Sequence, residues 1–540
     1  MAGPADPPTA ADLGAAADAV ARCEQVVIDA TRALATAGGA DTNQVVAYDL
    51  AHAASATATA RSALDYGAHG ELEARMACAF VADVVADLAA KIVGRALLWG
   101  VEASALSRTE EFVRAHRHPA TLAGLCGEQG PRHLSEEFEL VRDTFHRFAE
   151  QEVRPHAEHV HRTNGDVPES IINGLAELGG FGLSVPGEYE GFATGGESDY
   201  IGMVVATEEL SWGSLGIGGS LITRPEILTR ALVHGGTEEQ KRRWLPRLAT
   251  GETLAAVAVT EPDYGSDVAN IVTSASRTEG GWLVNGVKTW CTFAARADVL
   301  MLLARTDPDR SLAHRGISMF VVEKEPGGSS GFVHTVESGE GGPPGTGRME
   351  GRPIDTIGYR GMHSYEIAFD NWFVPAENLV GGEGGLGKGF YFQMQGFENG
   401  RLQTAARAVG VMQAAYEAAY DYAGNRKVFG SPIVEYQLTR AKLARMTVLI
   451  QAARQCSYQV ARLMAKGEGA LEASMLKAYV CRTAEWVTRE AMQIHGGMGY
   501  AEEFPVSRYF VDARVLSIFE GADETLAIKV IARRLLEQLG

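Results

Sequence analysis

The segment Ala258-Val-Thr-Glu-Pro-Asp-Tyr-Gly-Ser-Asp267 marks the point at which the chain changes from helical to β character. On its N-terminal side, residues 135–251 carry helical patterns. On its C-terminal side come short segments rich in Val, Ile, Phe and Trp and separated by Gly, Asp and Pro, which are typical of strands. A mostly β domain is therefore predicted, with Glu337–Pro353 as a Gly/Pro-rich surface loop. The expected strands are Leu254–Thr260, Trp282–Trp290, Val299–Arg305, Ile317–Lys324 and Tyr365–Pro375.

Helical patterns flank this β region on both sides. After Gly389, long helices are expected over about 390–422, 436–466, 471–495 and 522–538. The first 125 residues are Ala-rich, and apolar residues at helical spacing predict a helix over about 10–37, ended by Gly38-Gly39. Asp41-Thr42 is suited to cap the next helix, and Asp65–Gly70 predicts a further break. Three or four antiparallel helices are therefore expected in this region.

Because strands are segregated from helices along the chain, the predicted fold class is α+β and not doubly wound α/β. The Gly- and Pro-containing segment Gly124–His133 is expected to be a linker. The predicted domains are an N-terminal helical extension over 1–125, a helical domain over 131–254, a β domain over 255–378 and a C-terminal helical bundle over 385–540.

Composition limits the classes of function. The chain has 540 residues and a formal net charge of −19, from 49 basic and 68 acidic side chains, which argues against a nucleic-acid partner. Its six cysteines form no CxxC pair, as expected for reduced thiols in a cytoplasmic protein. No Lys or Arg precedes Arg22, so no targeting segment is expected. Four charged residues interrupt the most apolar stretch, Met76–Val101, so no membrane span is expected either.

Two patterns carry little functional weight. Gly382-Glu-Gly-Gly-Leu-Gly387 fits GxGxxG, but a dinucleotide fingerprint needs a strand before it, a helix after it and a βαβ setting. A glycine turn leading into the C-terminal helices is the preferred interpretation. His156, His159 and His161 cluster without a carboxylate or Cys at ligand spacing, so a solvated helix face is favoured over a metal site.

Several specific motifs remain, and they occur in a fixed order. They are Ala258–Asp267, Lys288-Thr-Trp-Cys-Thr292, Asn425-Arg-Lys-Val-Phe-Gly430, Gln493-Ile-His-Gly-Gly-Met-Gly-Tyr500 and Ile518-Phe-Glu-Gly521. Through them, residues 135–540 resemble the acyl-CoA dehydrogenase family. The resemblance implies a helical domain, a β-barrel-like domain and a C-terminal four-helix bundle, here with an extra N-terminal helical module. It also implies FAD as the cofactor and an acyl-CoA as the substrate.

The resemblance assigns roles around the flavin. Thr260 matches the residue at the flavin pyrimidine edge, Trp290 the aromatic wall and Thr292 the hydroxyl near N5. Arg426 matches the Arg that meets the FAD pyrophosphate from a neighbouring subunit, and a guanidinium suits such a target. Taken alone, Thr260 and Trp290 are also ordinary residues of a β domain. Further cofactor contacts are implied for Phe429, Gln493, Gly496, Gly497, Ala522 and Glu524.

The last two of these positions depart from the family pattern. After Glu520-Gly521 the family commonly has Thr and, two residues on, Gln, whereas this chain has Ala522 and Glu524. One flavin-phosphate contact is therefore expected to be lost or made by the backbone. Gly496 and Gly497 have a second interpretation, as the C-cap of the preceding helix.

Glu520 is the candidate catalytic base, the residue that takes the α-proton of the thioester in the family. Ile518 and Phe519 give it an apolar approach, which favours desolvation and a raised pKa, and Gly521 leaves room for a ligand. The alternative is an acidic residue that stabilises a helix N-terminus. Some family members place the base just before the Arg of an earlier helix, but that position here is Gly400, which supports Glu520.

Other residues resemble substrate contacts. Ser266 and Arg401 match positions that contact CoA, and Glu398 stands where the family often has an acidic partner. A solvated i,i+3 pair of Glu398 with Arg401 is the simpler alternative.

The N-terminal module and the Glu337–Pro353 insertion resemble the branch of the family that converts (2S)-methylsuccinyl-CoA to mesaconyl-CoA in the ethylmalonyl-CoA pathway. A buried distal carboxylate needs a cation or several donors. The candidates are Arg224, Arg360, His363 and Tyr365. For Arg224, a surface position paired with Glu226 is an equally acceptable interpretation.

Competing functions stay open at this point: a dehydrogenase for a short branched monocarboxylic acyl-CoA, an oxidase, and a flavoprotein scaffold with little activity. The family resemblance implies an electron-transferring flavoprotein as the electron acceptor. It also implies a homo-oligomer, either a dimer or a tetramer.

Overall fold

The computed structural model describes residues 10–337 and 345–539. The chain divides into two compact units. One combines the two ends of the chain, residues 1–140 and 404–540, and is called the terminal unit below. The other comprises residues 141–403 and is called the central unit. The division falls within the long helix α12, Gly389–Asn425.

The N-terminal extension is helical, as predicted. The helix expected over about 10–37 is α1, followed by α2 and α3, with breaks at Gly38-Gly39 and near Gly70. The predicted cap at Asp41-Thr42 is wrong: α2 begins after Asn43, whose side chain instead donates to the carbonyls of Ala37 and Gly39. The bounds are α1 Leu13–Thr36, α2 Gln44–Gly67, α3 Glu71–Ile92, α4 Glu110–His116 and α5 Pro119–Ala123.

The C-terminal part of the terminal unit is also helical. The helices expected over 436–466 and 471–495 are confirmed to within a residue, and the one over 522–538 is α16, a π-helical segment η12 and α17 in succession. The short helix α15 was not predicted. The bounds are α13 Gln437–Ala465, α14 Ala470–His495, α15 Pro505–Val515, α16 Asp523–Thr525, η12 Leu526–Ala532 and α17 Arg533–Glu537.

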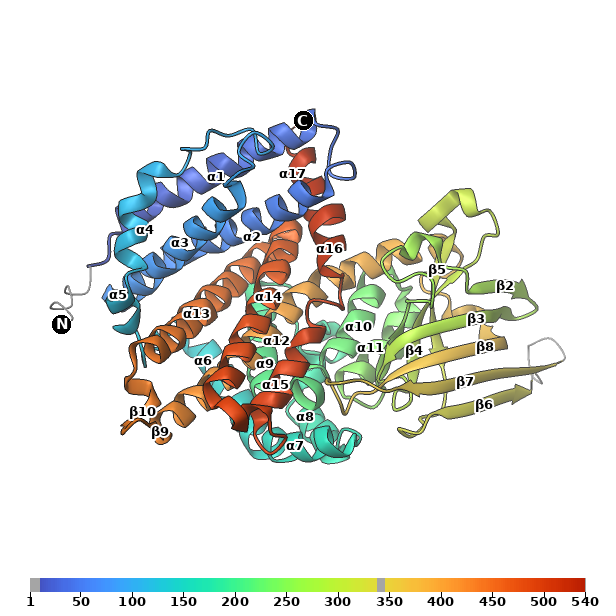
Figure 1. Cartoon of the computed structure of the whole chain (residues 1–540). Helices are drawn as coiled ribbons and strands as arrows, with labels where there is room; N and C mark the ends of the chain where they lie inside the picture. Colours follow the sequence, from blue (N-terminus) through green and yellow to red (C-terminus); the bar gives the residue numbers. More distant parts are fainter. Residues whose placement is uncertain (1–9, 338–344, 540) are drawn as a thin grey trace. The chain divides into compact units, whose positions relative to one another are not determined.

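The extension and the C-terminal helices share one hydrophobic core. Leu50 of α2 and Phe80 of α3 belong to the same buried cluster as Val448 of α13 and Ile531 of η12. Figure 1 shows the blue helices α2 and α3 beside the orange and red helices of the C-terminal region. The extension is therefore packed into the terminal unit and does not form a bundle of its own.

Polar contacts also tie the extension to α13. Asp83 of α3 accepts hydrogen bonds from Arg445 of α13 at 2.8 and 3.1 Å and from Arg117 at 2.8 Å. The expected linker Gly124–His133 has no helix, but Gln451 of α13 donates to the carbonyl of Gly130 at 2.6 Å. This segment is thus held by α13 along its course.

The central unit contains one eight-stranded sheet in the order β1-β4-β2-β3-β8-β7-β6, with β5 paired to β4. The pairs of β4 with β1 and with β2 are parallel, and the other pairs are antiparallel, which confirms the α+β class. The bounds are β1 Ala255–Ala258, β2 Ser274–Thr278, β3 Gly281–Thr292, β4 Val299–Arg305, β5 Ile317–Glu323, β6 Phe332–Glu337, β7 Thr346–Ile354 and β8 Ser364–Pro375.

Helices precede this sheet in the chain and cover part of it. Leu228 of α10 and Trp244 of α11 share a buried cluster with Ala255 of β1 and Met301 of β4, and Figure 1 shows α10 and α11 beside these strands. The bounds are α6 Glu136–Phe148, α7 Arg154–Thr163, α8 Glu169–Glu177, α9 Glu197–Gly213, α10 Thr223–Gly235 and α11 Glu238–Ala249.

The predicted surface loop Glu337–Pro353 is wrong over its second half. Thr346–Ile354 forms β7, paired with both β6 and β8, while residues 338–344 lie outside the described residues. Gly351 suggested a loop, but the strand needs it, because a Cβ there would lie 2.2 Å from the Phe332 ring. The GxGxxG segment is the expected turn: Gly382–Gly385 is a short 3₁₀ helix between β8 and α12.

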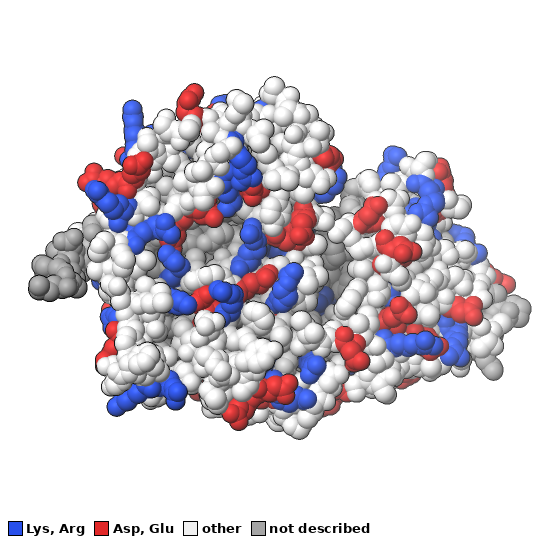
Figure 2. Space-filling view, viewed as in Figure 1, with Lys and Arg blue, Asp and Glu red and all other residues white. Residues whose placement is uncertain are grey.

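Figure 2 shows acidic and basic side chains interspersed over the face in view. All six cysteines are free thiols. Within residues 10–337 and 345–539, no helix has both the length and the apolar character needed to cross a bilayer. The same ranges contain no group of three His, Cys, Asp or Glu side chains placed to hold a metal ion.

Candidate active site

A buried ion pair fixes the backbone beside Thr260. The Lys288 ammonium lies 2.8 Å from Glu261 Oε1, and it also donates to the carbonyl of Val259 at 2.9 Å. The two charged side chains are 0% and 1% exposed. Because Thr289 N donates to the carbonyl of Thr260 at 2.8 Å, the end of β1 and the end of β3 are joined at this point.

The Glu261 carboxylate is held in its charged form. Burial by itself would raise its pKa, but the Lys288 ammonium and the backbone N–H groups of Val272 and Thr273 hold that pKa below the ordinary value. Removing one partner of a buried pair typically costs about 3–5 kcal/mol, because the other charge is left uncompensated. The pair therefore fixes the relative position of Thr260 and the residues that follow Lys288.

Trp290 is turned outward by an irregularity in the sheet. The β3–β8 register shifts between Lys288 and Cys291, and Trp290 adopts φ +57°. Its indole is 56% exposed although the residues on either side are buried. A bulge of this kind re-aims a side chain out of the regular alternation. Thr292 follows, buried, with its hydroxyl 3.1 Å from that of Ser364.

Two of the predicted site residues follow β1 in the sequence. Thr260, at the end of β1, is half-buried, and Ser266 lies exposed in the turn that follows it. Thr260, Trp290 and Thr292 are thus presented by the joined ends of β1 and β3. An exposed aromatic ring with hydroxyl groups at the same sheet end suits a flat, polar-edged ring such as a flavin.

Arg401 and Glu398 lie on α12 within the central unit. Arg401 is 7% exposed and Glu398 is half-buried, so a fully solvated pair of these two residues is excluded. Gly400 lies between them in the helix, and it carries no side chain that could serve as a base.

Arg224 is buried at the start of α10, which rules out the expected alternative of a surface Arg. It is 7% exposed, and its guanidinium lies 3.4 Å from the Tyr359 hydroxyl. Burial raises the pKa of the Cys291 thiol to about 12, although the cations of Lys288 and Arg224 both act to lower that pKa. Arg224 therefore lies near Cys291, the residue that separates Trp290 from Thr292 in the sequence.

The other candidates for binding a distal carboxylate are bonded to groups of the protein or buried. Arg360 donates to the carbonyls of Thr356 at 3.1 Å and His161 at 2.8 Å. His363 Nε2 lies 3.1 Å from Asp166 Oδ1 and holds the pKa of that carboxyl below its ordinary value. Tyr365 is 2% exposed, and burial raises the pKa of its phenol.

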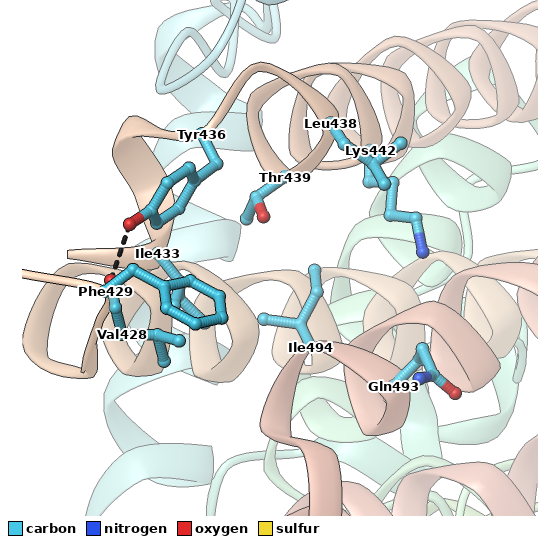
Figure 3. Close-up of a pocket in the computed structure, with 9 residues that line it drawn as sticks. All are labelled: Val428, Phe429, Ile433, Tyr436, Leu438, Thr439, Lys442, Gln493 and Ile494. Atoms are coloured by element: carbon cyan, nitrogen blue, oxygen red, sulfur yellow. Dashed lines mark hydrogen bonds between the residues drawn. The ribbon is translucent and has the colours of Figure 1, made fainter. Parts of the chain in front are cut away.

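In the terminal unit, Phe429 and Gln493 line one shallow pocket of about 320 Å³. Figure 3 shows the Phe429 ring and the Gln493 amide at different ends of it, with Lys442 nearby. Phe429 is 97% exposed and adopts φ +52°. Arg426 is exposed just before it, at the end of α12. The structure thus brings together two residues that are far apart in the sequence and that were both predicted as cofactor contacts.

Gly496 and Gly497 follow the same helix end. Gly496 ends α14 with φ +59°, a conformation that favours glycine, and both glycines are exposed. The C-cap interpretation is therefore correct for Gly496. It leaves room for a ligand contact as well, because backbone without side chains is exposed at this point.

Glu520 lies in a tight turn before α16. It adopts φ +53°, and Gly521 follows with φ +101°. The Lys477 ammonium donates to the carbonyl of Gly521 at 2.6 Å, and the Arg407 guanidinium lies 4.7 Å from the centre of the Phe519 ring. A non-glycine residue with positive φ persists only where its surroundings hold it there. The helix then begins at Asp523, as predicted, with half-buried Ala522 as its N-cap and Glu524 exposed.

Three lysines were given no role by the sequence interpretation. Lys288 supports Thr260 and Trp290, Lys477 holds the Glu520 turn, and Lys442 lines the pocket with Phe429 and Gln493. A signal was available for two of them. Lys288 falls on an inward-facing position of β3 and Lys477 on the apolar face of α14, and a lysine in either setting implies a specific partner.

Comparison with known proteins agrees with the family resemblance of the motifs. Profiles of the acyl-CoA dehydrogenase N-terminal, middle and C-terminal domains match residues 135–252, 256–372 and 387–536. The (2S)-methylsuccinyl-CoA dehydrogenase of Cereibacter sphaeroides is 45% identical over 436 residues, 79% of this chain and 76% of that protein. The acyl-CoA dehydrogenase of Bacillus subtilis (strain 168) is 35% identical over 405 residues, 75% of this chain and 99% of that protein.

A solved structure has the same fold. The glutaryl-coenzyme A dehydrogenase glutaryl-CoA complex superposes with a TM-score of 0.67 at 29% identity, covering 76% of this chain and 96% of that one. Since the three profiles follow one another along residues 135–536 and the motifs occur in the family's order, the chain belongs to the acyl-CoA dehydrogenase family, whose reaction is the α,β-dehydrogenation of acyl-CoA thioesters.

Proposed function

We propose that this enzyme oxidises (2S)-methylsuccinyl-CoA to mesaconyl-CoA, with FAD as its cofactor and Glu520 as its base. The observation that carries the choice of substrate is the 45% identity to the Cereibacter sphaeroides (2S)-methylsuccinyl-CoA dehydrogenase over 436 residues. Relatives such as the Bacillus subtilis acyl-CoA dehydrogenase are less similar, at 35%. The buried cation Arg224 supports the same choice, because a dicarboxylic monothioester brings a second carboxylate into the site.

The residues fit FAD in each unit taken by itself. In the central unit, the exposed Trp290 ring is the wall for the isoalloxazine, with Thr260 and Thr292 as hydrogen-bonding neighbours. In the terminal unit, Arg426 offers a guanidinium to a pyrophosphate, and the pocket of Phe429 and Gln493 suits the adenosine part. Further contacts fall to exposed backbone at Gly496 and Gly497 and at the Ala522–Glu524 helix start.

The protein's own part in the chemistry is proton removal and orientation. Glu520 takes the α-proton of the thioester, and Gly521 beside it has no side chain to obstruct the acyl group. Ser266, Arg401 and Glu398 hold the CoA portion of the substrate, which orients the acyl chain that follows it. Bound FAD supplies a two-electron acceptor for the β-hydride.

The remaining assignments are part of the same proposal. Electrons pass to an electron-transferring flavoprotein, the enzyme works in the cytoplasm, and it is a homo-oligomer. The exposure of Arg426 and Phe429 suits the proposed oligomer, because both side chains are free to contact the cofactor of a second subunit.

Arg426→Ala is expected to weaken retention of FAD more than binding of acyl-CoA. The lost contact is a charge-assisted hydrogen bond to phosphate, worth about 1.5–3 kcal/mol, or about ten- to a hundredfold in affinity. The measurement is the flavin-to-protein ratio after gel filtration, with substrate titrations of the reloaded enzyme. Arg534→Ala, which removes an exposed Arg from α17, is the matched control. A variant that keeps all its flavin but loses substrate affinity would place Arg426 on the other ligand.

Arg224→Met tests the substrate. Its kcat/KM for (2S)-methylsuccinyl-CoA should fall about ten- to a hundredfold, because a buried charge-assisted bond to the distal carboxylate is lost. For 2-methylbutyryl-CoA, which lacks that carboxylate, it should stay the same or rise slightly. Both substrates are mixed anaerobically with wild type and variant, and bleaching of the flavin is followed.

The two-substrate comparison cancels general damage to fold, flavin and base. An equal loss on both substrates would make Arg224 structural, and no loss on either would redirect the search to Arg360, His363 and Tyr365. A wild-type enzyme that prefers 2-methylbutyryl-CoA or isobutyryl-CoA would remove the dicarboxylate proposal and favour the short branched monocarboxylic substrate.

A further inference from the structure

Two residues of the N-terminal extension contact the turn that carries Glu520. The Tyr48 hydroxyl donates to Asp523 Oδ2 at 2.6 Å, and His52 Nε2 lies 3.2 Å from the same oxygen. Tyr48 and His52 are one helical turn apart on α2, so they present one face. Their rings meet edge to face with centroids 4.6 Å apart. The first residue of α16 is thus bonded to a helix 475 residues away in the sequence.

This contact is buried and charge-assisted. The side chains of His52 and Asp523 are 6% and 13% exposed. Burial would raise the pKa of Asp523, but the bonds from His52 and Tyr48 hold it below its ordinary value. Burial and the bond to Asp523 raise the pKa of Tyr48 to about 12, so its phenol remains a donor at neutral pH. Hydrogen bonds to a charged acceptor are about twice as strong as neutral ones.

The turn needs such support. Glu520 and Gly521 are two successive residues with positive φ, a conformation that Glu adopts only when its neighbours impose it. On one side the turn is held by Lys477, through the carbonyl of Gly521. On the other side Asp523 is held by α2. Ala522, between them, has no hydroxyl with which to anchor the turn to a cofactor.

From these contacts we infer that Tyr48 and His52 are positioning residues for Glu520. Through Asp523 they fix the turn in which the carboxylate stands, so the N-terminal extension acts in the proton-abstraction step. The inference rests on the proposed role of Glu520 as the base. It gives the extension a function in catalysis that is distinct from its share in the hydrophobic core.

The experiment follows flavin reduction in the full-length, FAD-loaded enzyme after rapid anaerobic mixing with (2S)-methylsuccinyl-CoA. Tyr48→Phe should lower the limiting rate constant about tenfold, and Asp523→Ala about ten- to a hundredfold, because a base displaced by a fraction of an ångström loses its alignment. Substrate affinity should change less than about twofold, since the CoA contacts are untouched. The α-deuterium isotope effect should rise as proton abstraction becomes slower.

The matched control is Tyr66→Phe, which removes a second buried phenol hydroxyl from the same helix α2. It should leave the rate constant unchanged. The double variant Tyr48→Phe/Asp523→Ala should be no slower than Asp523→Ala, because both substitutions remove the same Tyr48–Asp523 hydrogen bond. His52→Gln, which keeps a donor, should retain more activity than His52→Ala.

Three outcomes would overturn the inference: an unchanged rate constant in Tyr48→Phe and Asp523→Ala, additive losses in the double variant, or a fall in melting temperature without a slower reduction step. A failure of the proposed base is recognised separately, because Glu520→Gln would then stay active. If Glu520→Gln is inactive while Tyr48→Phe equals wild type, only the positioning role fails.

Discussion

Glu520→Gln is expected to lower the rate of flavin reduction by a factor of about 10² to 10⁴ while leaving the fold and the bound FAD in place. The amide is nearly the same size as the carboxylate but cannot accept the α-proton, and loss of a general base typically costs this much. The measurement is rapid anaerobic mixing with (2S)-methylsuccinyl-CoA, following the oxidised flavin band, with the flavin content and melting curve of the variant beside it.

A surface variant provides the control. Glu537→Gln removes an exposed carboxylate from α17 and should reduce its flavin at the wild-type rate. If Glu520→Gln keeps more than about a tenth of that rate, the carboxylate is not the base, since a tenfold loss is below the range for a general base. The helix N-terminus interpretation of Glu520 would then be preferred, and its main effect would be on stability.

Deletion of residues 1–125 is expected to leave a chain that aggregates or changes its oligomeric state. The buried core of the terminal unit is shared: removing α1–α3 uncovers Val448 and Met475 on the long helices and Ile531 near the C-terminus. A continuous apolar face of this kind drives association. The measurement is soluble yield and size-exclusion chromatography against the full-length protein. A soluble fragment of unchanged oligomeric state and full activity would show the extension to be an independent appendage.

Two point variants of α2 test whether solubility depends on packing of the shared core, with the extension still present. Leu50→Asp places a charge at a position of α2 that is 0% exposed and should reproduce the loss of soluble protein. Val45→Asp, on the same helix but 71% exposed, should not. Equal behaviour of the two variants would mean that the shared core does not govern solubility.

The fold was predictable where one local signal determined an element. β4 was predicted with its observed bounds, because all seven of its residues are buried and the first six form one apolar run that ends at Arg305. α14 was predicted to within one residue, because Gly496 ends it at a backbone angle that favours glycine. α1 was likewise given by its apolar spacing and by Gly38-Gly39.

Elements that depend on distant partners were missed. β7 contains Gly347, Gly351 and Pro353, which suggest a loop in isolation, and it is a strand because β6 and β8 pair with both its edges. β2 is polar except for the buried Ala275, so it lacks the usual alternation. The cap of α2 also differed, because the Asn43 side chain bonds back to the preceding turn and leaves the helix end.

The candidate site was likewise predictable where local motifs determine it and not where distant contacts do. Thr260, Trp290 and Thr292 lie within short motifs that the sequence displays, whereas the support of Thr260 by the Lys288–Glu261 pair requires the folded sheet. The burial of Arg224 depends on packing that its own neighbourhood in the sequence does not reveal. The contact of Tyr48 with Asp523 joins two residues that look ordinary in their own segments.

That last contact has a consequence for how the protein is made. Tyr48 leaves the ribosome first, and its partner Asp523 follows 475 residues later. At synthesis rates of about 5–20 residues per second, the delay is roughly 25 to 95 s. During that time α1, α2 and α3 exist without the C-terminal helices that complete their core, so part of their apolar surface stays exposed to solvent. Faster or slower translation of the long segment between them should therefore change the yield of native enzyme without changing a single residue.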